Sequence, residues 1–128
     1  MSVPGFLLTK SVPVTLKRRT AGSYVDGDWV EGSISDVVIQ ANVQPARDHE
    51  IMMLPESERS KEWLKIYSAS EIRAQIEGVG GHDSDEFDWE SMEDGKVYRF
   101  KVMKVRRYKM SILDHWRGMA VRLEITPN

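Results

Sequence analysis

The segment that begins at His82 is the closest approach in this chain to a metal-binding or catalytic motif. The run His82-Asp83-Ser84-Asp85-Glu86-Phe87-Asp88 has the alternating acids of a calcium-binding loop. It departs from that motif because Phe87 takes the fifth ligand position, Asp88 replaces the turn glycine and Asp94 stands where glutamate is needed. Paired carboxylates such as Asp88 and Glu90 can do acid–base chemistry. In a segment this acidic, we expect both to stay ionised and exposed.

Other residue types that carry chemistry are scarce or isolated. His49, His82 and His115 lie far apart in the sequence, without the short spacing of metal ligands. The absence of cysteine excludes disulfides, thiolate metal sites and cysteine nucleophiles, and fits folding in a reducing cytoplasm. The glycine-rich residues 78–81 lack the lysine and the following helix of a phosphate-binding loop. We therefore predict a protein that is not an enzyme and that holds no metal or cofactor.

The strongest pattern is a separation of charge into two neighbouring blocks. Residues 83–94 contain seven acids and no base, and residues 96–109 contain seven bases and no acid. A formal net charge of -2 conceals this separation, because the blocks cancel. A surface with two signs suits self-association or docking better than it suits catalysis. The alternative interpretation is a solvated acidic loop beside a strand that has one basic face.

Length and composition indicate one globular domain. A chain of 128 residues has room for one modest core. Its 41% hydrophobic and 30% charged residues are close to the globular average. No apolar run approaches the ~20 residues of a membrane helix. The apolar patch Phe6-Leu7-Leu8 lacks the basic segment and the cleavage pattern of a signal peptide.

Alternating apolar residues predict a long hairpin over residues 10–45. Apolar side chains occupy every second position on both sides of Asp26-Gly27, which is a strong two-residue turn signal. Folding about this turn gives a register whose pairs are Val12 with Ala41, Val14 with Ile39, Leu16 with Val37, Arg18 with Ser35, and Tyr24 with Trp29. The hairpin then has an apolar base, a polar middle and an aromatic tip. The tip either projects or merely clasps the turn.

The middle of the chain predicts a loop, a strand and a short helix. Residues 46–60 are polar apart from Ile51-Met52-Met53-Leu54, which we expect either to tuck under the domain or to meet a partner. Residues 61–77 hold a strand from Trp63 to Ser68, then a capping box and the helical spacing of Ile72 and Ile76. Residues 78–95 are expected to form an acidic loop.

Residues 96–126 predict the closing strands. The apolar face changes sides at Val102-Met103, which indicates a β-bulge of the kind that turns a barrel corner. Val121, Leu123 and Ile125 alternate in the last strand. The fold class is therefore mainly β: one small antiparallel β-barrel or sandwich domain over residues 1–128, with long loops and at most one or two short helices. The expected core is Val14, Leu16, Val37, Ile39, Ile66, Phe100, Val121 and Leu123.

A basic stripe with interleaved rings also fits a nucleic-acid-binding barrel. The stripe comprises Arg99, Lys101, Lys104, Arg106, Arg107 and Lys109, with the stacking rings of Tyr98 and Tyr108 interleaved along it. The residues that would face DNA are Lys104, Arg106, Arg107 and Lys109. A sequence pI of about 5.9 argues against tight binding, because dedicated binders usually carry net positive charge.

The organisation of the chain resembles the head-completion proteins of tailed bacteriophages, also called stoppers or head–tail connector proteins. The resemblance covers most of the chain. Its elements are the hairpin from Val12 to Ala41 with Val43-Gln44-Pro45, the strand from Trp63 to Ser68, the entry Asp88…Asp94-Gly95-Lys96-Val97-Tyr98, and the strand His115…Ala120-Val121-Arg122-Leu123.

The resemblance implies a β-barrel that joins a homo-oligomeric ring beneath the portal of a filled capsid. There it would retain DNA and dock the tail, with the portal or adaptor ring and the tail-terminator or tail-tube proteins as partners. The implied location is the neck of a virion assembled in the host cytoplasm, with passing contact to packaged DNA, no membrane and no catalytic residues. The alternatives are a tail-completion or tail-terminator protein and a nucleic-acid-binding barrel.

The charge blocks suggest how such a ring would join. We expect residues 83–94 of one subunit to lie against the basic strand of the next, with apolar contacts supplying the affinity. The candidate interface residues are Tyr24, Trp29, Ile51, Met52, Met53, Leu54, Asp83, Asp85, Glu86, Asp88, Arg99, Lys101, Lys104, Arg106 and Arg107. In the competing interpretations the acidic block folds onto its own basic strand, or the basic face turns inward to DNA. Residues 46–60 and 78–94 are expected to be mobile until assembly.

Overall fold

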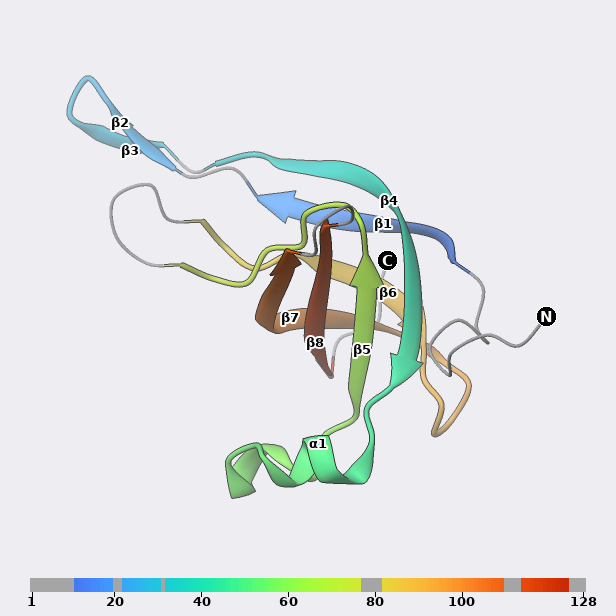
Figure 1. Cartoon of the computed structure of the whole chain (residues 1–128). Coiled ribbons are helices and arrows are strands. Elements are labelled where there is room, and N and C mark those ends of the chain that lie inside the picture. The colour runs from blue at the N-terminus through green and yellow to red at the C-terminus, as the bar shows by residue number, and fades with distance from the viewer. Residues whose placement is uncertain (1–10, 20–21, 31, 77–81, 110–113, 125–128) are drawn as a thin grey trace.

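A computed structural model shows a closed antiparallel β-barrel of six strands, which confirms the expected fold class (Figure 1). The structure describes residues 11–19, 22–30, 32–76, 82–109 and 114–124. Around the barrel the strands follow the order β1-β4-β5-β8-β7-β6. Their bounds are β1 Val12–Arg19, β4 Ile34–Pro45, β5 Trp63–Ser68, β6 Glu86–Glu90, β7 Val97–Lys109 and β8 Asp114–Arg122. One pair, Lys17 with Glu86, joins β6 back to β1.

The predicted hairpin register is confirmed. β1 pairs with β4 so that Leu16 lies opposite Val37, and the short strands β2 (Ser23–Val25) and β3 (Asp28–Val30) set Tyr24 opposite Trp29. Asp26 and Gly27 both have positive φ, 52° and 86°, as a two-residue hairpin turn requires. β2 and β3 form a separate two-stranded sheet that extends away from the barrel (Figure 1).

β4 is long enough to belong to two walls of the barrel. Its first part pairs with β1 as far as Ala41, and from Ala41 to Pro45 it pairs with β5. In Figure 1 the strand bends as it passes from one neighbour to the other. Pro45 ends the strand, because proline has no N–H to continue the ladder. The next residue, Ala46, donates its N–H to the carbonyl of Trp63.

The expected bulge in β7 is confirmed. The register against β8 shifts between Val102 and Lys104, so Met103 is the extra residue. Val102 is buried, whereas Met103 is 48% exposed. Because of this extra residue, the inward-facing positions of the strand change from even to odd numbers. Val105 therefore packs against the core.

The segment 46–60 folds into α1 (Asp48–Met52) and the 3-10 helix η2 (Glu56–Glu58). Part of its apolar run tucks under the domain, as one of the two expectations had it: Leu54 is buried with Trp63 in a second small cluster. Met52 and Met53 are exposed, and a partner for them stays a prediction. Arg59 donates to the carbonyl oxygens of Leu54 and Met52. These local contacts give residues 46–60, called the excursion below, their own structure at the end of the barrel opposite the hairpin (Figure 1).

Three sequence-based expectations are wrong. Residues 69–76 contain no helix, because Ile72 is buried in the core and Ile76 instead pairs with His82 as an isolated bridge. The expected acidic loop contains β6, since Phe87 is fully buried against the core. β8 begins at Asp114 and ends at Arg122, earlier than the alternation of the last residues predicts. Ile125 lies outside the described residues.

The core fills the barrel, and most of its members were expected. Of the expected set, Val37 and Leu123 are only half-buried, and the others are buried. Phe87 was missed; its ring stacks on Phe100 with centroids 5.9 Å apart. Within the described part of the chain, no helix is long and apolar enough to cross a membrane.

Candidate functional site

The acidic block pairs with bases of its own chain. β6 lies beside the start of β7, which sets Asp88 opposite Arg99. Arg99 Nε is 2.6 Å from Asp88 Oδ1, and Arg99 Nη1 is 3.3 Å from Glu86 Oε1. Hydrogen bonding to Asp88 outweighs the opposing effect of burial and raises the pKa of the Arg99 guanidinium. This arrangement is the competing interpretation of the charge blocks, in which the acids fold back onto their own strand.

The start of the acidic block is held by β1. Asp83 lies 3.4 Å from Arg19, an exposed pair, whereas Asp85 is fully buried against Arg18. The hydrogen bonds to Asp85 raise the pKa of Arg18 despite its partial burial. Asp85 is therefore a structural residue, which corrects its assignment to an exposed interface. Arg99, one member of the basic strand, is engaged within its own chain. The expected pairing of this block with a neighbouring subunit stays a prediction.

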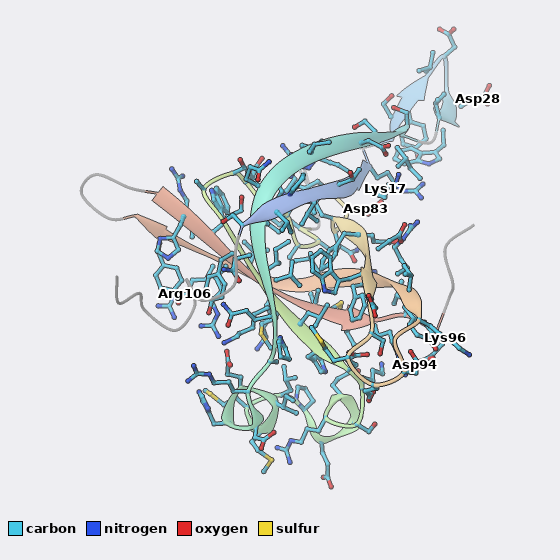
Figure 2. The ribbon with its side chains drawn as sticks, turned by 90° about the vertical axis from the view of Figure 1, so that its right-hand side faces the viewer. Lys17, Asp28, Asp83, Asp94, Lys96 and Arg106 are labelled. Atoms are coloured by element: carbon cyan, nitrogen blue, oxygen red, sulfur yellow. The ribbon has the colours of Figure 1, made fainter. Side chains whose placement is uncertain are left out.

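The distal half of β7 keeps an exposed basic surface. Lys104, Arg106 and Arg107 are exposed, and Lys101 is half-exposed nearer the acidic strand. Among the described residues, neither Lys104 nor Arg106 forms an ion pair with a carboxylate. Lys109 ends β7, and its side chain lies outside the described part of the structure. In Figure 2, Arg106 lies on the opposite side of the molecule from Asp94 and Lys96.

Aromatic rings accompany these bases. The guanidinium of Arg106 lies 5.4 Å from the Tyr108 ring centroid, and that of Arg107 lies 5.2 Å from the Trp116 ring centroid. Tyr108 stacks on His115 at 4.9 Å. Such cation–π contacts hold the guanidinium groups over apolar surface and still leave them able to bind an anion.

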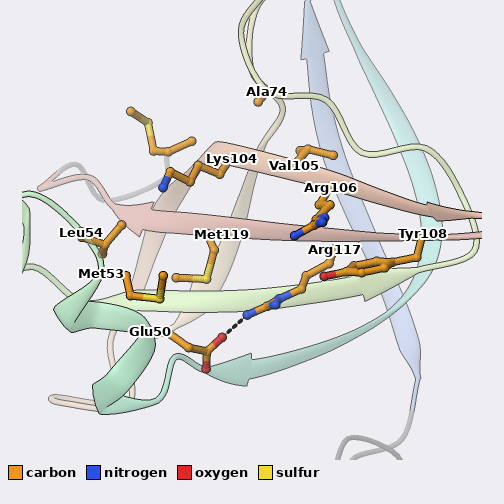
Figure 3. Close-up of a pocket in the computed structure, with 11 residues that line it drawn as sticks. Glu50, Met53, Leu54, Ala74, Lys104, Val105, Arg106, Tyr108, Arg117 and Met119 are labelled. Carbon is orange, nitrogen blue, oxygen red and sulfur yellow. Dashed lines mark hydrogen bonds and ion pairs between the residues drawn. The ribbon is translucent and has the colours of Figure 1, made fainter.

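Beside this surface lies a pocket of about 530 Å³ between α1 and the β7–β8 pair (Figure 3). Most of its lining is apolar: Met53, Leu54, Ala74, Met103, Val105 and Met119, with the ring of Tyr108. The charged side chains in the lining are Lys104, Arg106, Arg117 and Glu50. Met53 and Leu54 belong to the excursion, whereas Met103 belongs to β7 and Met119 to β8. The pocket therefore exists only because the excursion packs beside the barrel.

Glu50 fastens α1 to the barrel wall. Its carboxylate lies 3.1 Å from Lys65 Nζ and also accepts a hydrogen bond from Arg117 (Figure 3). Burial raises the pKa of Glu50, but the Arg47 N–H and the two cations outweigh it, so the pKa is lowered overall. The three side chains come from segments far apart in the sequence. No spacing signal in the sequence indicated this cluster, and it was missed.

The hairpin tip is the second exposed feature. Tyr24 is 74% exposed and Trp29 is 54% exposed, although their rings touch edge to face at 5.1 Å. The rings therefore clasp each other and also project, so both interpretations of the tip hold. Asp26 and Asp28 place two acids and no base on the same turn.

Within the described ranges, no group of three or more His, Cys, Asp or Glu side chains is placed to hold a metal ion. Neither a protein-family model nor a curated protein sequence matches this chain. The geometry therefore leaves two surfaces to interpret: the hairpin tip, and the basic surface with its neighbouring pocket.

Proposed function

We propose that this protein is a virion structural protein of a tailed bacteriophage, forming a ring at the head–tail interface. The ring would close the DNA-filled head and dock the tail. The supporting observation is a closed barrel with an exposed extension at each end: the β2–β3 hairpin on one side, and the excursion of residues 46–60 on the other (Figure 1). A ring subunit needs a rigid body and exposed parts that reach the components above and below it.

The barrel itself favours association through side chains. β4, β5 and β8 each pair with a neighbouring strand on both sides, so these walls of the barrel offer little strand edge for another chain to extend. Exposed apolar side chains instead gather on the extensions, with Tyr24 and Trp29 on the hairpin and Met52 and Met53 on the excursion. The partners proposed are other copies in the ring, the portal or adaptor ring, and tail-terminator or tail-tube proteins. The proposed location is the neck of the virion.

The test is a phage that carries a stop codon in this gene. If the protein closes heads, cells should accumulate filled heads that lose their DNA, beside complete tails that do not attach. Supplying the protein from a plasmid should restore intact particles, and an antibody should then label their necks. A tail-terminator protein would instead leave closed heads and tails of irregular length. Normal particles made without the protein would contradict both assignments.

The second candidate function is nucleic-acid binding, because the exposed bases of β7 lie over the rings of Tyr108 and Trp116. A single-stranded oligonucleotide bound by Lys104, Arg106 and Arg107 would release about two counterions, at about 0.7 per contact. The slope of log affinity against log salt should then be about −2 and should flatten when the three bases become glutamine. A Lys61→Gln control, at an exposed base elsewhere, should leave the slope unchanged. No binding at low salt would exclude this function.

A further inference from the structure

We propose that the tip of the β2–β3 hairpin of one copy docks into the pocket between α1 and the β7–β8 pair of the next copy. This inference rests on the proposed ring function and names the contact that would join its subunits. The tip comprises residues 23–30, and the pocket is the one that Met53, Val105 and Met119 line beside Lys104 and Arg106.

The tip has the composition of a binding anchor. Two aromatic side chains, Tyr24 and Trp29, stand beside Val25 and Val30, and all four are at least 47% exposed. Aromatic side chains of this size bury about 150–250 Å² each when covered, and tryptophan and tyrosine are enriched among interface hot spots. The turn is already ordered by its own hydrogen-bonded sheet. Docking would therefore cost little additional chain entropy.

The pocket has matching size and chemistry. Its volume of about 530 Å³ lies within the range of about 300–1,000 Å³ typical of binding pockets. Three methionines line it, and their flexible thioether side chains adapt to an incoming ring and make favourable sulfur–aromatic contacts. Met53 is 82% exposed, so the pocket is open to a partner.

The charges of the two surfaces are opposite. The tip carries Asp26 and Asp28 and no base. Neither acid has an ion-pair partner among the described residues. Across the contact they would face Lys104 and Arg106, which also lack carboxylate partners within the described chain. A tip-to-tip dimer would instead oppose acid to acid, so charge favours a tip-to-pocket contact.

The placement of the two surfaces makes the contact intermolecular. The hairpin leaves the barrel at one end, and α1, which flanks the pocket, lies at the other end (Figures 1 and 3). Figure 2 likewise shows Asp28 far from Arg106. A tip therefore cannot reach its own pocket. Repeated contact between different surfaces runs head to tail, and it closes into a ring when the rotation between copies permits.

The absence of cysteine in the chain allows a direct test by disulfide trapping. One full-length sample carries Asp28→Cys and a second carries Met53→Cys. When they are mixed and oxidised, we expect a covalent dimer of the two variants on a non-reducing gel. A chain with both substitutions should give a ladder that ends at the ring size. The matched control replaces Met53→Cys with Gln40→Cys, an exposed site on β4 away from the pocket, and should give no dimer above background.

A second arm measures the contact without cysteines. Trp29→Ala should weaken association by about 30-fold or more, as expected for a hot-spot residue that contributes about 2 kcal/mol. Reversing both tip acids to lysine, or both Lys104 and Arg106 to glutamate, should also weaken association, and combining the two reversals should restore it. Glu56→Lys, an exposed control on η2, should have no effect. Unchanged thermal melting of each variant confirms that it folds.

The outcomes separate this inference from the function on which it rests. Rings that form without a tip-to-pocket crosslink overturn the inference and leave the head–tail assignment standing. A chain that stays monomeric and uncrosslinked at its highest soluble concentration also overturns the inference. Crosslinks that extend into open fibres support the contact. The phage test fails or succeeds independently, because it asks whether the virion needs the protein and not how two copies touch.

Discussion

The guanidinium of Arg18 donates two hydrogen bonds to the buried carboxylate of Asp85, from Nε at 3.0 Å and from Nη2 at 2.9 Å. The same carboxylate accepts the backbone N–H of Arg73, and the carbonyl oxygen of Asp85 accepts the N–H of Val102. One residue thus ties β1, the segment after β5, and β7 together. It does so near the seam between β1 and β6, where a single residue pair completes the barrel.

Removing the base of this pair should strongly destabilise the barrel. Arg18→Met leaves the Asp85 charge buried without its main partner, so the free energy of unfolding should fall by about 3–5 kcal/mol. The matched control is Arg19→Met, because Arg19 and Asp83 form an exposed pair worth about 0–1 kcal/mol. Chemical denaturation of both variants measures the difference. Equal stability of the two would show that Asp85 does not depend on Arg18.

The stacked rings of Phe87 and Phe100 predict a second substitution that strongly lowers the free energy of unfolding. Phe100→Ala removes a fully buried ring that packs against Phe87, and should cost about 3–5 kcal/mol. The control is Val38→Ala on the outside of β4, where the side chain is 63% exposed and the expected change is about 0.5 kcal/mol or less. Thermal and denaturant unfolding test both. A Phe100 variant that melts within a degree or two of the parent would contradict the assigned core.

The lowered pKa of Glu50 predicts that the stability of the fold depends on pH in the acidic range. Its pKa is lower in the folded protein than in the unfolded chain, so at acidic pH the folded state binds fewer protons than the unfolded chain does. The ion pairs with Lys65 and Arg117 therefore contribute fully above the ordinary glutamate pKa of about 4.3 and are lost as the pH falls through the lower folded value. Glu50→Gln should reduce the slope of stability against pH below about pH 4.3.

The control for this slope is Glu56→Gln, at an exposed position on η2. Denaturant titrations at several pH values give the free energy of unfolding for the parent and both variants. The parent and the Glu56 variant should lose stability in parallel, and the Glu50 variant should lose less. A Glu50 variant that follows the parent slope would show that the cluster beside α1 contributes no acid sensitivity.

Two glycines with positive φ lie in different turns, one in the hairpin tip and one in the barrel. Gly27 has φ +86° at the tip, and Gly95 has φ +74° in the turn between β6 and β7. An alanine in this conformation costs about 1–2 kcal/mol at either position. Gly27→Ala should loosen only the separate β2–β3 sheet, which hydrogen exchange of that segment measures, and should leave the melting temperature unchanged. Gly95→Ala should lower the melting temperature, because its turn connects two barrel strands.

Much of the strand pattern could be predicted from local sequence. The Asp26-Gly27 turn and the alternation around it determined the register of β1 with β4, because a slip of one residue would turn the apolar side chains outward. The change of apolar face in β7 likewise located the bulge at Met103. Both signals are local: each depends only on which face of one strand or hairpin a side chain occupies.

Only the tertiary structure determined the contacts between segments that are distant in the sequence. Phe87 was hidden among acids, and it became a core residue because β6 pairs with β7 and turns that side chain inward. The charge blocks were plain in the sequence, but the strand pairing determined that Asp88 meets Arg99 of its own chain. Glu50 and Arg117 meet only after β5 and β8 have paired and α1 has packed beside them. Contacts between distant segments depend on how the barrel closes, and alternation within one segment carries no information about that closure.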